Sequence, residues 1–357
     1  MRAALFVGVD QPLSIEDVTP IDPRPGEVLV RVAASGVCHS DLSVVNGTIP
    51  SAGAQVLGHE GAGTVEAVGA GVRDLAVGDH VIGSFIPACG SCWFCLNDES
   101  HLCSHTYPAM AVTHATRADG SELPSFTGLG TFAETMTVSE HSVVKVETDL
   151  PDEQLALIGC GVTTGVGAAL NTAKVAPGSI VAVVGCGGVG QAVIQGAHLA
   201  GAARIIAIDP VALKRDAALA LGATDAVDPT EVAPRAAVRE LSGGRGADYA
   251  FEVIGTPETI REAVEITRPG GTTVMVGLPR LSADIGIPAM SVLTEKRILG
   301  CVYGSARVRR DFPRLIALVE QGKLDVGAMV TRTMGLDDVN EALRLMQAGE
   351  VIRTVIV

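Results

Sequence analysis

The sequence predicts an α/β protein in which a mainly β region is followed by a doubly wound parallel sheet. Residues 1–153 contain short runs rich in Val and Thr, whereas residues 154–300 alternate apolar strand-like runs with Ala-rich helical stretches. The chain has 357 residues, which is more than one hydrophobic core usually holds, so we expect two domains.

The mainly β region is indicated by strand-length runs and turn signals. Residues 27–32 and 63–68 have the composition of half-buried strands, and Pro23-Arg24-Pro25-Gly26 directly precedes the first run. We therefore expect residues 1–153 to form a β-rich domain with many loops.

The second region has the alternation that is typical of a parallel sheet with helices on both faces. About six strands are expected, and the elements that can be placed are a strand at 180–184, a helix at 189–200, a strand at 204–208, a helix at 212–221 and strands at 249–253, 272–276 and 297–302. Residues 301–357 add helices at 312–321 and 336–348 and a final strand at 353–357. We expect this last segment to return to the first domain.

Composition argues against two classes of partner. The net charge of −14 would repel a phosphate backbone, and Lys and Arg cluster no further than pairs such as Arg309-Arg310, so nucleic acid is not expected. The most apolar stretch, 180–194, is Gly-rich and shorter than the roughly 20 residues that cross a bilayer, so no membrane span is expected. The N-terminus lacks the pattern of a signal peptide, which favours a cytoplasmic protein.

Four of the eight cysteines are closely spaced, at Cys89, Cys92, Cys95 and Cys103. Four thiolates at this spacing can close a tetrahedral zinc site with Zn–S bonds of about 2.3 Å and leave no open position. The segment around these cysteines is too polar to be part of a hydrophobic core. The sequence therefore predicts a structural zinc site.

A second set of metal-ligand residues is dispersed along the chain at Cys38, His59 and Cys160. Two thiolates and one imidazole would leave a fourth coordination position for water or substrate, as a catalytic zinc requires. A lone cysteine such as Cys160, in an apolar Gly-rich stretch, is more often a core residue than a ligand. Only the combination of the three residues with the four-cysteine loop favours a second zinc.

A glycine-rich turn indicates a dinucleotide site. It follows an expected strand, opens an expected helix, precedes Asp209 by about 20 residues, and contains Gly185, Gly187, Gly188, Val189 and Gly190. Pyrophosphate would lie at the helix N-terminus, and Asp209 would accept hydrogen bonds from the ribose hydroxyls and repel a 2′-phosphate. NAD is therefore favoured over NADP. Lys214 could also reach the ribose, while Arg215 is either a partner for a 2′-phosphate or, as we favour, a solvated basic residue.

With these three elements in this order, the whole chain resembles the zinc-containing medium-chain dehydrogenase/reductase family, in particular its liver-type zinc-dependent alcohol dehydrogenases. The resemblance also covers the motifs Gly58–Gly63, Val77–Val81, Phe251–Gly255 and Ile352–Val355. It implies a GroES-like catalytic domain with both zinc sites at 1–153, a Rossmann domain at 154–300 and a returning segment at 301–357. The agreement is specific for the family and much less so for the substrate.

The resemblance also implies roles for individual residues. Cys38, His59 and Cys160 would hold the catalytic zinc, with Glu60 behind the metal. Asp41 would orient His59, or alternatively would be a plain helix N-cap residue. The cofactor site would include His39, Arg353 and Ile254, the first two at the pyrophosphate.

The expected reaction is hydride transfer from a zinc-bound alcohol to the nicotinamide, with Ser40 taking the first proton. Many relatives pass that proton on to a histidine at the position of Ser43 here. Because Ser43 cannot act as a base near neutral pH, we hypothesise that water at Ser43, or His39, completes the transfer.

The pocket positions that the family suggests are small or apolar, namely Ser40, Ile49, Phe85, Phe126 and Val302. Such a pocket favours aromatic or medium-chain alcohols. A thiol-adduct formaldehyde dehydrogenase is disfavoured, since its charged entrance positions match Ile49 and Tyr107 here. Two further functions are compatible with the motifs: a nicotinoprotein that never releases NAD(H), and a zinc- and NAD-binding sensor without turnover. The length of segment 104–131 favours a homodimer over a tetramer.

Overall fold

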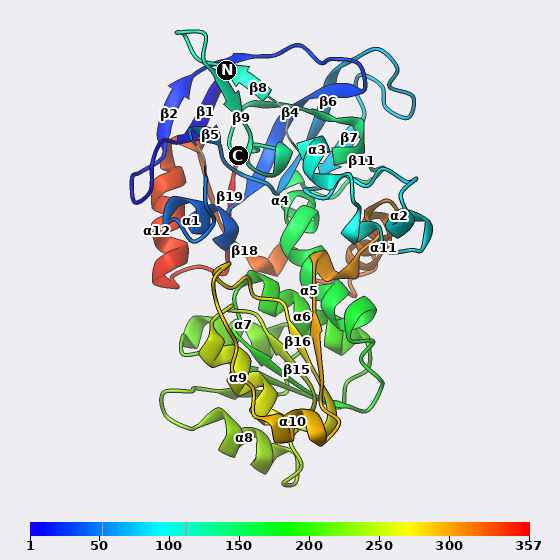
Figure 1. The fold of residues 1–357 in the computed structure, drawn as a ribbon, viewed down its shortest axis with the longest axis vertical. Helices are drawn as coiled ribbons and strands as arrows, with labels where there is room; N and C mark the ends of the chain where they lie inside the picture. Colours follow the sequence, from blue (N-terminus) through cyan, green and yellow to red (C-terminus); the bar gives the residue numbers. More distant parts are fainter. Residues whose placement is uncertain (52, 111–112) are drawn as a thin grey trace. The chain divides into compact units, whose positions relative to one another are not determined.

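The computed structural model describes residues 1–51, 53–110 and 113–357, which form two compact units (Figure 1). Unit 1 comprises Met1–Gly161 together with Arg307–Val357, and unit 2 comprises Val162–Ala306.

Unit 1 is mainly β. Its largest sheet has the strand order β11-β7-β6-β4-β19-β18, with β10 also paired to β4, and two three-stranded sheets have the orders β2-β1-β5 and β3-β8-β9. The strands are β1 (Arg2–Phe6), β2 (Ser14–Asp17), β3 (Thr19–Pro20), β4 (Glu27–Gly36), β5 (Gln55–Val56), β6 (Gly61–Val68), β7 (His80–Gly83), β8 (Thr113–Thr116), β9 (Glu122–Pro124), β10 (Thr135–Ser139), β11 (Val143–Lys145), β18 (Val330–Met334) and β19 (Arg353–Ile356). The helices are α1 (His39–Val45), α2 (Trp93–Leu96), α3 (Thr106–Met110), α4 (Asp152–Leu157), α11 (Val308–Glu320) and α12 (Val339–Ala348).

Two antiparallel pairings in unit 1 bring distant segments together. Ser35 of β4 lies opposite Gly61 of β6, so the residues that follow β4 lie beside those that precede β6. Val355 of β19 lies opposite Gly36, which adds the C-terminal strand to the same place. No side chain fits at Gly36, because a Cβ there would lie 2.2 Å from a carboxylate oxygen of Glu60.

Unit 2 contains one parallel sheet with the order β14-β13-β12-β15-β16-β17. Its strands are β12 (Ile180–Val184), β13 (Arg204–Ile208), β14 (Asp225–Val227), β15 (Ala247–Glu252), β16 (Thr267–Met275) and β17 (Arg297–Gly300). Its helices are α5 (Thr163–Gly167), α6 (Gly188–Leu199), α7 (Ala212–Ala220), α8 (Pro234–Leu241), α9 (Pro257–Ile266) and α10 (Ala289–Leu293).

Alternate residues of β12 enter two different cores. Val181 and Val183 pack with residues of α6 and α7, whereas Ala182 and Val184 pack with residues of α8 and α9. Since successive side chains of a strand point to opposite faces, helices cover both faces of the sheet. The predicted α/β class with a doubly wound parallel sheet is confirmed.

Several elements differ from the sequence prediction. The short strand β14 and the helices α8 and α9 are additional to the elements placed from the sequence, and β16 begins at Thr267, five residues before the expected strand. That extension runs through Pro269-Gly270-Gly271, a tripeptide typical of a turn, and the pairing of β15 with β16 shifts register between Ala247 and Tyr249. An irregular edge of this kind accommodates residues that ordinary strands avoid.

One helical run in the described part of the chain, Asp152–Thr172, is long and apolar enough to cross a membrane by length and composition. However, 78% of its most apolar window is buried inside the protein, as in a core helix.

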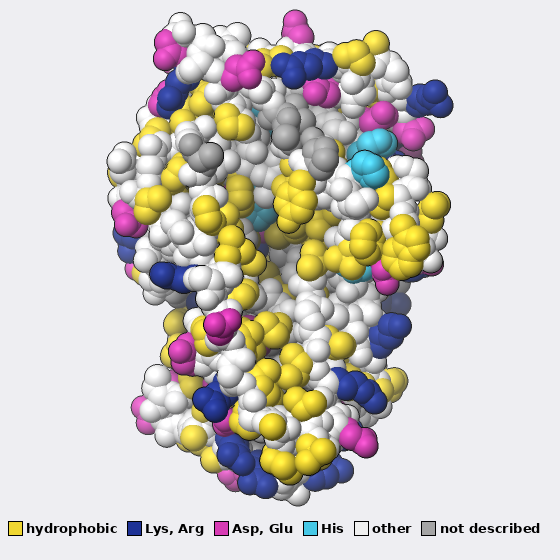
Figure 2. Space-filling view, viewed as in Figure 1, with side chains coloured by type: hydrophobic (Ala, Val, Ile, Leu, Met, Phe, Trp, Pro, Cys, Tyr) yellow, Lys and Arg dark blue, Asp and Glu magenta, His cyan; other side chains and the backbone are white. Residues whose placement is uncertain are grey.

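Figure 2 shows apolar side chains at the surface of unit 2, and the exposed ones around α10 include Leu281, Met290, Val292 and Leu293.

Candidate metal centres and dinucleotide site

A buried cluster in unit 1 contains Cys38, His59, Glu60 and Cys160. One ligand atom from each residue lies within 4.8 Å of those from the others, and all four side chains are buried. Cys38 precedes α1, His59 and Glu60 directly precede β6, and Cys160 belongs to a single π-helical turn, Ile158–Val162. The β4–β6 pairing therefore brings two segments of the cluster together.

Asp41 connects the cluster to the start of α1. Its Oδ1 accepts from Nδ1 of His59 at 3.1 Å and from the Gly58 amide at 3.1 Å, while its Oδ2 accepts from the Cys38 amide at 3.2 Å. Asp41 makes the histidine contact, and it is not the N-cap of α1: Cys38 is the N-cap, and Asp41, at the third position of the helix, accepts from the N-cap amide. Because a carboxylate only accepts, the His59 hydrogen is fixed on Nδ1, and Nε2 is the nitrogen available as a ligand.

The pKa values of Cys38 and His59 are shifted by the charges within the cluster. The hydrogen bond from Cys160 lowers the pKa of Cys38 well below its usual value, against the opposing effect of burial. Burial alone would lower the pKa of His59, but the negative charges of Asp41 and Cys38 outweigh burial and raise this pKa well above its usual 6.5. A bound zinc would require neutral His59, so it would take the place of the imidazolium proton beside the Cys38 thiolate.

Glu60 pairs with Arg353 of β19, and both side chains are buried. Burial raises the pKa of Glu60 to about 7, and the guanidinium opposes that increase. Oε1 of Glu60 has no hydrogen-bond partner among the described residues. The two thiols, the imidazole and this unpaired carboxylate oxygen are a donor set that suits zinc.

The second cluster consists of Cys89, Cys92, Cys95 and Cys103, whose Sγ atoms also lie within 4.8 Å of one another. Backbone amides donate to the sulfurs. The amides of Ser91 and Cys92 donate to Cys89 at 3.4 and 3.3 Å, and those of Cys89 and His105 donate to Cys103, both at 3.4 Å.

Hydrogen bonds favour the thiolate forms of Cys89 and Cys92 in this second cluster, whereas burial raises the pKa of Cys95 to about 12. The side-chain and backbone hydrogen bonds from Ser91 lower the pKa of Cys89 to about 7. The backbone hydrogen bond from Cys95 is the largest of the effects that lower the pKa of Cys92 to about 5. This set fits a closed zinc site. His105 Nδ1 lies 3.5 Å from the Cys89 sulfur, a neighbour that the cysteine spacing alone does not predict.

The expected pocket residues of unit 1 lie on two sides of the buried cluster. The rings of Phe85 and Phe126 meet the His59 ring edge-on, with centroids 5.8 and 5.4 Å away. Ser40 lies on α1 with its Oγ 3.9 Å from the Cys38 sulfur. Ile49 and Phe126 both pack against the same buried apolar cluster.

The remaining predicted residues lie at the surface or on the same helix. His39 begins α1 and is exposed, and Ser43 is half-buried one turn further along. Tyr107 is 83% exposed. Val302 belongs to unit 2, where it is 48% exposed.

A cavity of about 560 Å³ in unit 1 is bordered by Ile49 and Phe126. Its other wall includes Arg117, Ser121 and Glu122. Arg117 donates two hydrogen bonds to the Glu16 carboxylate, each of 3.0 Å, so its charge is already compensated.

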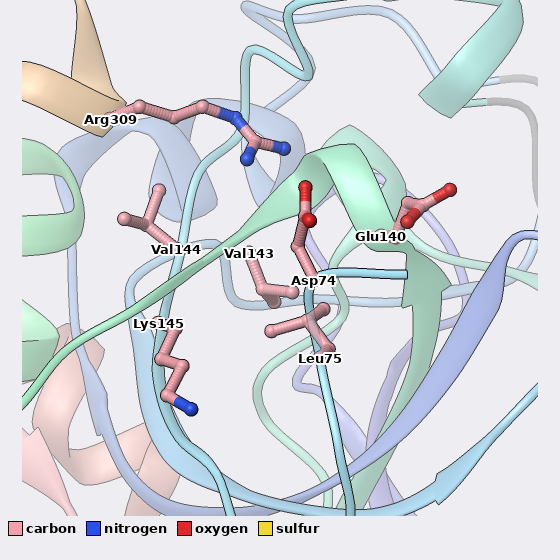
Figure 3. A pocket seen from close by; sticks show the side chains of 7 residues that line it. All are labelled: Asp74, Leu75, Glu140, Val143, Val144, Lys145 and Arg309. Atoms are coloured by element: carbon pink, nitrogen blue, oxygen red, sulfur yellow. The ribbon is translucent and has the colours of Figure 1, made fainter. Parts of the chain in front are cut away.

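Figure 3 shows a separate, smaller cavity of about 190 Å³, also in unit 1. It is lined by Asp74, Leu75, Glu140, Val143, Val144, Lys145 and Arg309. The Lys145 ammonium pairs with Asp79 at 2.7 Å. The lining groups carry charges of both signs, and none belongs to the predicted site.

The glycine-rich loop that is expected to bind a dinucleotide joins β12 to α6 in unit 2. Gly185 has φ of +93°, and a Cβ at Gly190 would lie 2.0 Å from the Gly185 carbonyl oxygen, so both positions require glycine. In contrast, a Cβ at Gly187, the N-cap of α6, would meet nothing within 4 Å. The open helix N-terminus leaves room for an anion such as pyrophosphate.

Asp209, which directly follows β13, braces this loop. Its Oδ2 accepts from the Cys186 amide at 2.8 Å and its Oδ1 from the Val211 amide at 2.9 Å. Ile254, 47% exposed, lies beside Gly185, where its side chain limits the space for a Cβ. Lys214 lies in the first turn of α7, and its carbonyl accepts from the Gln191 side chain at 2.9 Å.

Comparison with known proteins gives consistent matches along the chain. Residues 24–148 match the model of the alcohol dehydrogenase GroES-like domain, and residues 188–321 match that of zinc-binding dehydrogenase. The chain is 38% identical over 364 residues to an S-(hydroxymethyl)glutathione dehydrogenase of Synechocystis sp., with 99% of each sequence covered.

Two solved structures resemble the chain over nearly its whole length. An alcohol dehydrogenase zinc-binding domain protein of Burkholderia ambifaria has a TM-score of 0.93 and 35% identity, covering 99% of this chain and 98% of that one. A benzyl alcohol dehydrogenase of Acinetobacter calcoaceticus has a TM-score of 0.92 and 32% identity, with the same coverage.

Proposed function

We propose that this chain, which belongs to the zinc-containing medium-chain dehydrogenase family, reversibly oxidises aromatic or medium-chain alcohols to aldehydes or ketones with NAD. The single observation that carries the proposal is the buried cluster of Cys38, His59 and Cys160 with two phenylalanine rings against the histidine. It combines a donor set for zinc with apolar walls for a substrate.

In this proposal Cys38, His59 and Cys160 hold one zinc, and the four-cysteine cluster holds a second, structural zinc. Zinc at the first site would polarise the alcohol oxygen and lower its pKa. Asp41 keeps the His59 hydrogen on Nδ1, and Glu60, neutralised by Arg353, provides a carboxylate behind the ligands.

The chain's own residues would then manage the proton. Ser40, whose Oγ lies 3.9 Å from the Cys38 sulfur, would accept the alcohol proton. Ser43 lies one turn along α1, where a water could carry the proton towards solvent, with His39 as the alternative. NAD would bind at the loop of Gly185–Gly190, with its ribose at Asp209.

The two aromatic rings support an aromatic substrate. Phe85 and Phe126 present apolar surface beside the His59 ligand, and Ile49 extends that surface into the cavity of about 560 Å³. The relative from Acinetobacter calcoaceticus is named as a benzyl alcohol dehydrogenase, which agrees with this inference.

A second candidate substrate is the thiol adduct of formaldehyde and glutathione. It is favoured by the name of the Synechocystis relative and by the presence of Arg117 in the cavity wall. Against it, Arg117 is already paired with Glu16, so a glutathione carboxylate would have to displace that partner. We therefore place the adduct second.

The test is NADH formation by zinc-loaded protein with benzyl alcohol, hexanol and the glutathione adduct. We expect the highest kcat/KM for benzyl alcohol. In Phe126→Leu this kcat/KM should fall about tenfold, because the substitution removes one aromatic ring from the wall of the proposed pocket. Phe94→Leu is the matched control, since Phe94 packs against Trp93 in the four-cysteine segment. A higher kcat/KM for the adduct would overturn the substrate assignment.

The same sample distinguishes an exchanging dehydrogenase from a nicotinoprotein and from a sensor. Absorbance near 340 nm that persists through gel filtration would indicate a nicotinoprotein, and zinc and NAD binding without turnover of any alcohol would indicate a sensor. We expect NAD to exchange freely and the zinc content to be near two per chain.

We further propose that the chain is a cytoplasmic homodimer. None of its eight cysteines, all of which the structure describes, is in a disulfide, which agrees with a reducing compartment. In unit 2, β17 is at the edge of the sheet and the neighbouring Leu281 and Leu293 are 82% and 74% exposed, a combination typical of an interface. Light scattering should give twice the chain mass, and Leu293→Glu should reduce it.

A further inference from the structure

A half-buried ion pair joins two strand ends of the sheet in unit 2. Nη1 of Arg215, on α7, lies 2.9 Å from Oδ2 of Asp228, the residue that follows β14. The same nitrogen donates to the carbonyl oxygen of Asp209, at the end of β13, at 2.7 Å. The two side chains are 19% and 22% exposed, so Arg215 is not the freely solvated residue that the sequence suggested.

Asp228 is itself held in position as an anion. Its Oδ1 accepts from the Thr230 amide at 2.9 Å and from the Thr230 hydroxyl at 2.6 Å. These hydrogen bonds, with the Arg215 charge, keep the pKa of Asp228 below its usual 3.8. The partner of Arg215 is therefore charged near neutral pH and held by two hydrogen bonds from Thr230.

Arg215 lies beside the position where the adenosine ribose is proposed to bind. It contacts the main chain of Asp209, whose carboxylate is the expected acceptor for the ribose hydroxyls. An arginine at this place is the residue that pairs with the 2′-phosphate of NADP in other dinucleotide sites, because a guanidinium binds phosphate through two hydrogen bonds. Here the guanidinium is turned to Asp228 instead.

We propose that Asp228 is a specificity-determining positioning residue: it holds Arg215 against the ends of β13 and β14 and so withholds a cation from a 2′-phosphate. The inference rests on the proposed NAD site at Gly185–Gly190. Two features would then disfavour NADP: the negative charge of Asp209 repels the 2′-phosphate, and the Arg215 guanidinium is paired with Asp228 and not available to it. Substitution of Asp228 would free the guanidinium and leave the charge of Asp209 unchanged.

Asp228→Asn is the direct test, because an asparagine oxygen still accepts from Thr230 and keeps the turn. Binding of adenosine 2′,5′-bisphosphate and of AMP to the zinc-loaded protein is measured by calorimetry. We expect the affinity for the bisphosphate to rise about 5- to 20-fold, as one new charge-assisted contact provides, with less than about twofold change for AMP. The kcat/KM ratio of NADP to NAD should rise by a similar factor.

Asp225→Asn is the matched control. Asp225 lies in the same strand segment, pairs with Arg204, and its substitution removes the same charge without affecting Arg215. It should change the bisphosphate-to-AMP affinity ratio by less than about twofold. In the double variant Arg215→Met/Asp228→Asn the gain in bisphosphate affinity should disappear. Arg215→Met alone should have the same bisphosphate-to-AMP affinity ratio as the parent.

A gain in Asp228→Asn that survives Arg215→Met, or that appears equally in Asp225→Asn, would overturn the inference, because general charge or Lys214 would then account for it. An unchanged ratio in Asp228→Asn, with normal AMP binding, would overturn this inference alone. If the parent bound neither nucleotide, both the dinucleotide site and the inference would fail.

Discussion

The acid sensitivity of unit 1 is expected to depend on one buried histidine, His114 of β8. The side chain is 2% exposed, and burial lowers its pKa from the usual 6.5 to about 3, with the Gly128 backbone opposing only part of this shift. In the folded protein the ring is therefore neutral above about pH 3, whereas in the unfolded chain it binds a proton below about pH 6.5.

The direction of the effect follows from the proton balance. Because the unfolded chain binds more protons between pH 6.5 and 3, stability rises with pH in that window and is lost as the pH falls. Each pH unit corresponds to about 1.4 kcal/mol. Lowering the pH from 7 to 5 should therefore remove about 2 kcal/mol of unfolding free energy through His114 alone.

The assay is urea unfolding of the zinc-loaded parent and of His114→Leu at pH 7 and pH 5. Leucine fills a similar volume and does not titrate, so the drop between the two pH values should be smaller in the variant by about 2 kcal/mol. Protonation of the zinc ligands affects both proteins alike and cancels in this comparison. His141→Leu, at an exposed position, is the control and should keep the drop of the parent. An unchanged drop in His114→Leu would refute the reasoning.

Other outcomes concern the two cysteine clusters and the buried ion pair. Cys103→Ser should lower the zinc content of dialysed protein from about two to about one per chain, whereas Cys186→Ser should leave it unchanged, and elemental analysis decides between them. Asp41→Asn should weaken zinc binding about 10- to 100-fold in competition with a chelator, because His59 loses its carboxylate partner; unaltered affinity would contradict this. Arg353→Met should lower the unfolding free energy in urea by about 3–5 kcal/mol, since it leaves a buried carboxylate without its counter-charge, and a loss below about 1 kcal/mol would contradict it.

The parts of the fold that follow from periodicity could be predicted from the sequence. The strands β12 and β13 and the helix α7 have continuous apolar or amphipathic patterns, and their predicted bounds agree with the structure to within a residue. The three-residue strand β14 is too short to show any period. Helices α8 and α9 carry weaker signals in the sequence, Pro234 and Pro257 at their first turns and the Thr256 cap, which mark where a helix begins but not that one follows.

Some features of the candidate site could likewise be predicted from the sequence and others could not. Residue types at fixed spacing, such as the four cysteines, can be recognised in the sequence itself. The contacts of Glu60 with Arg353 and of Arg215 with Asp228 cannot, because they join residues whose proximity depends on strand pairing. Sequence separation alone, 293 residues in the first pair, gives no signal for such contacts.

Two aspartates combine a structural contact with the proposed chemistry, which affects how their variants must be interpreted. Asp41 accepts from the Cys38 amide at the start of α1 and from His59, and Asp209, the residue proposed to bind the ribose, accepts from two loop amides. Alanine at either position would remove an amide acceptor and a charge together, so lost activity would not separate folding from function. Asparagine retains one oxygen acceptor and removes the charge. Because both oxygens of each aspartate accept hydrogen bonds, the asparagine amide nitrogen would leave one donor unpaired and lower the unfolding free energy by about 1–3 kcal/mol. A function that depends on charge should therefore fall in the asparagine variants by more than this loss of stability explains, when activity is compared at a temperature at which parent and variant are both folded.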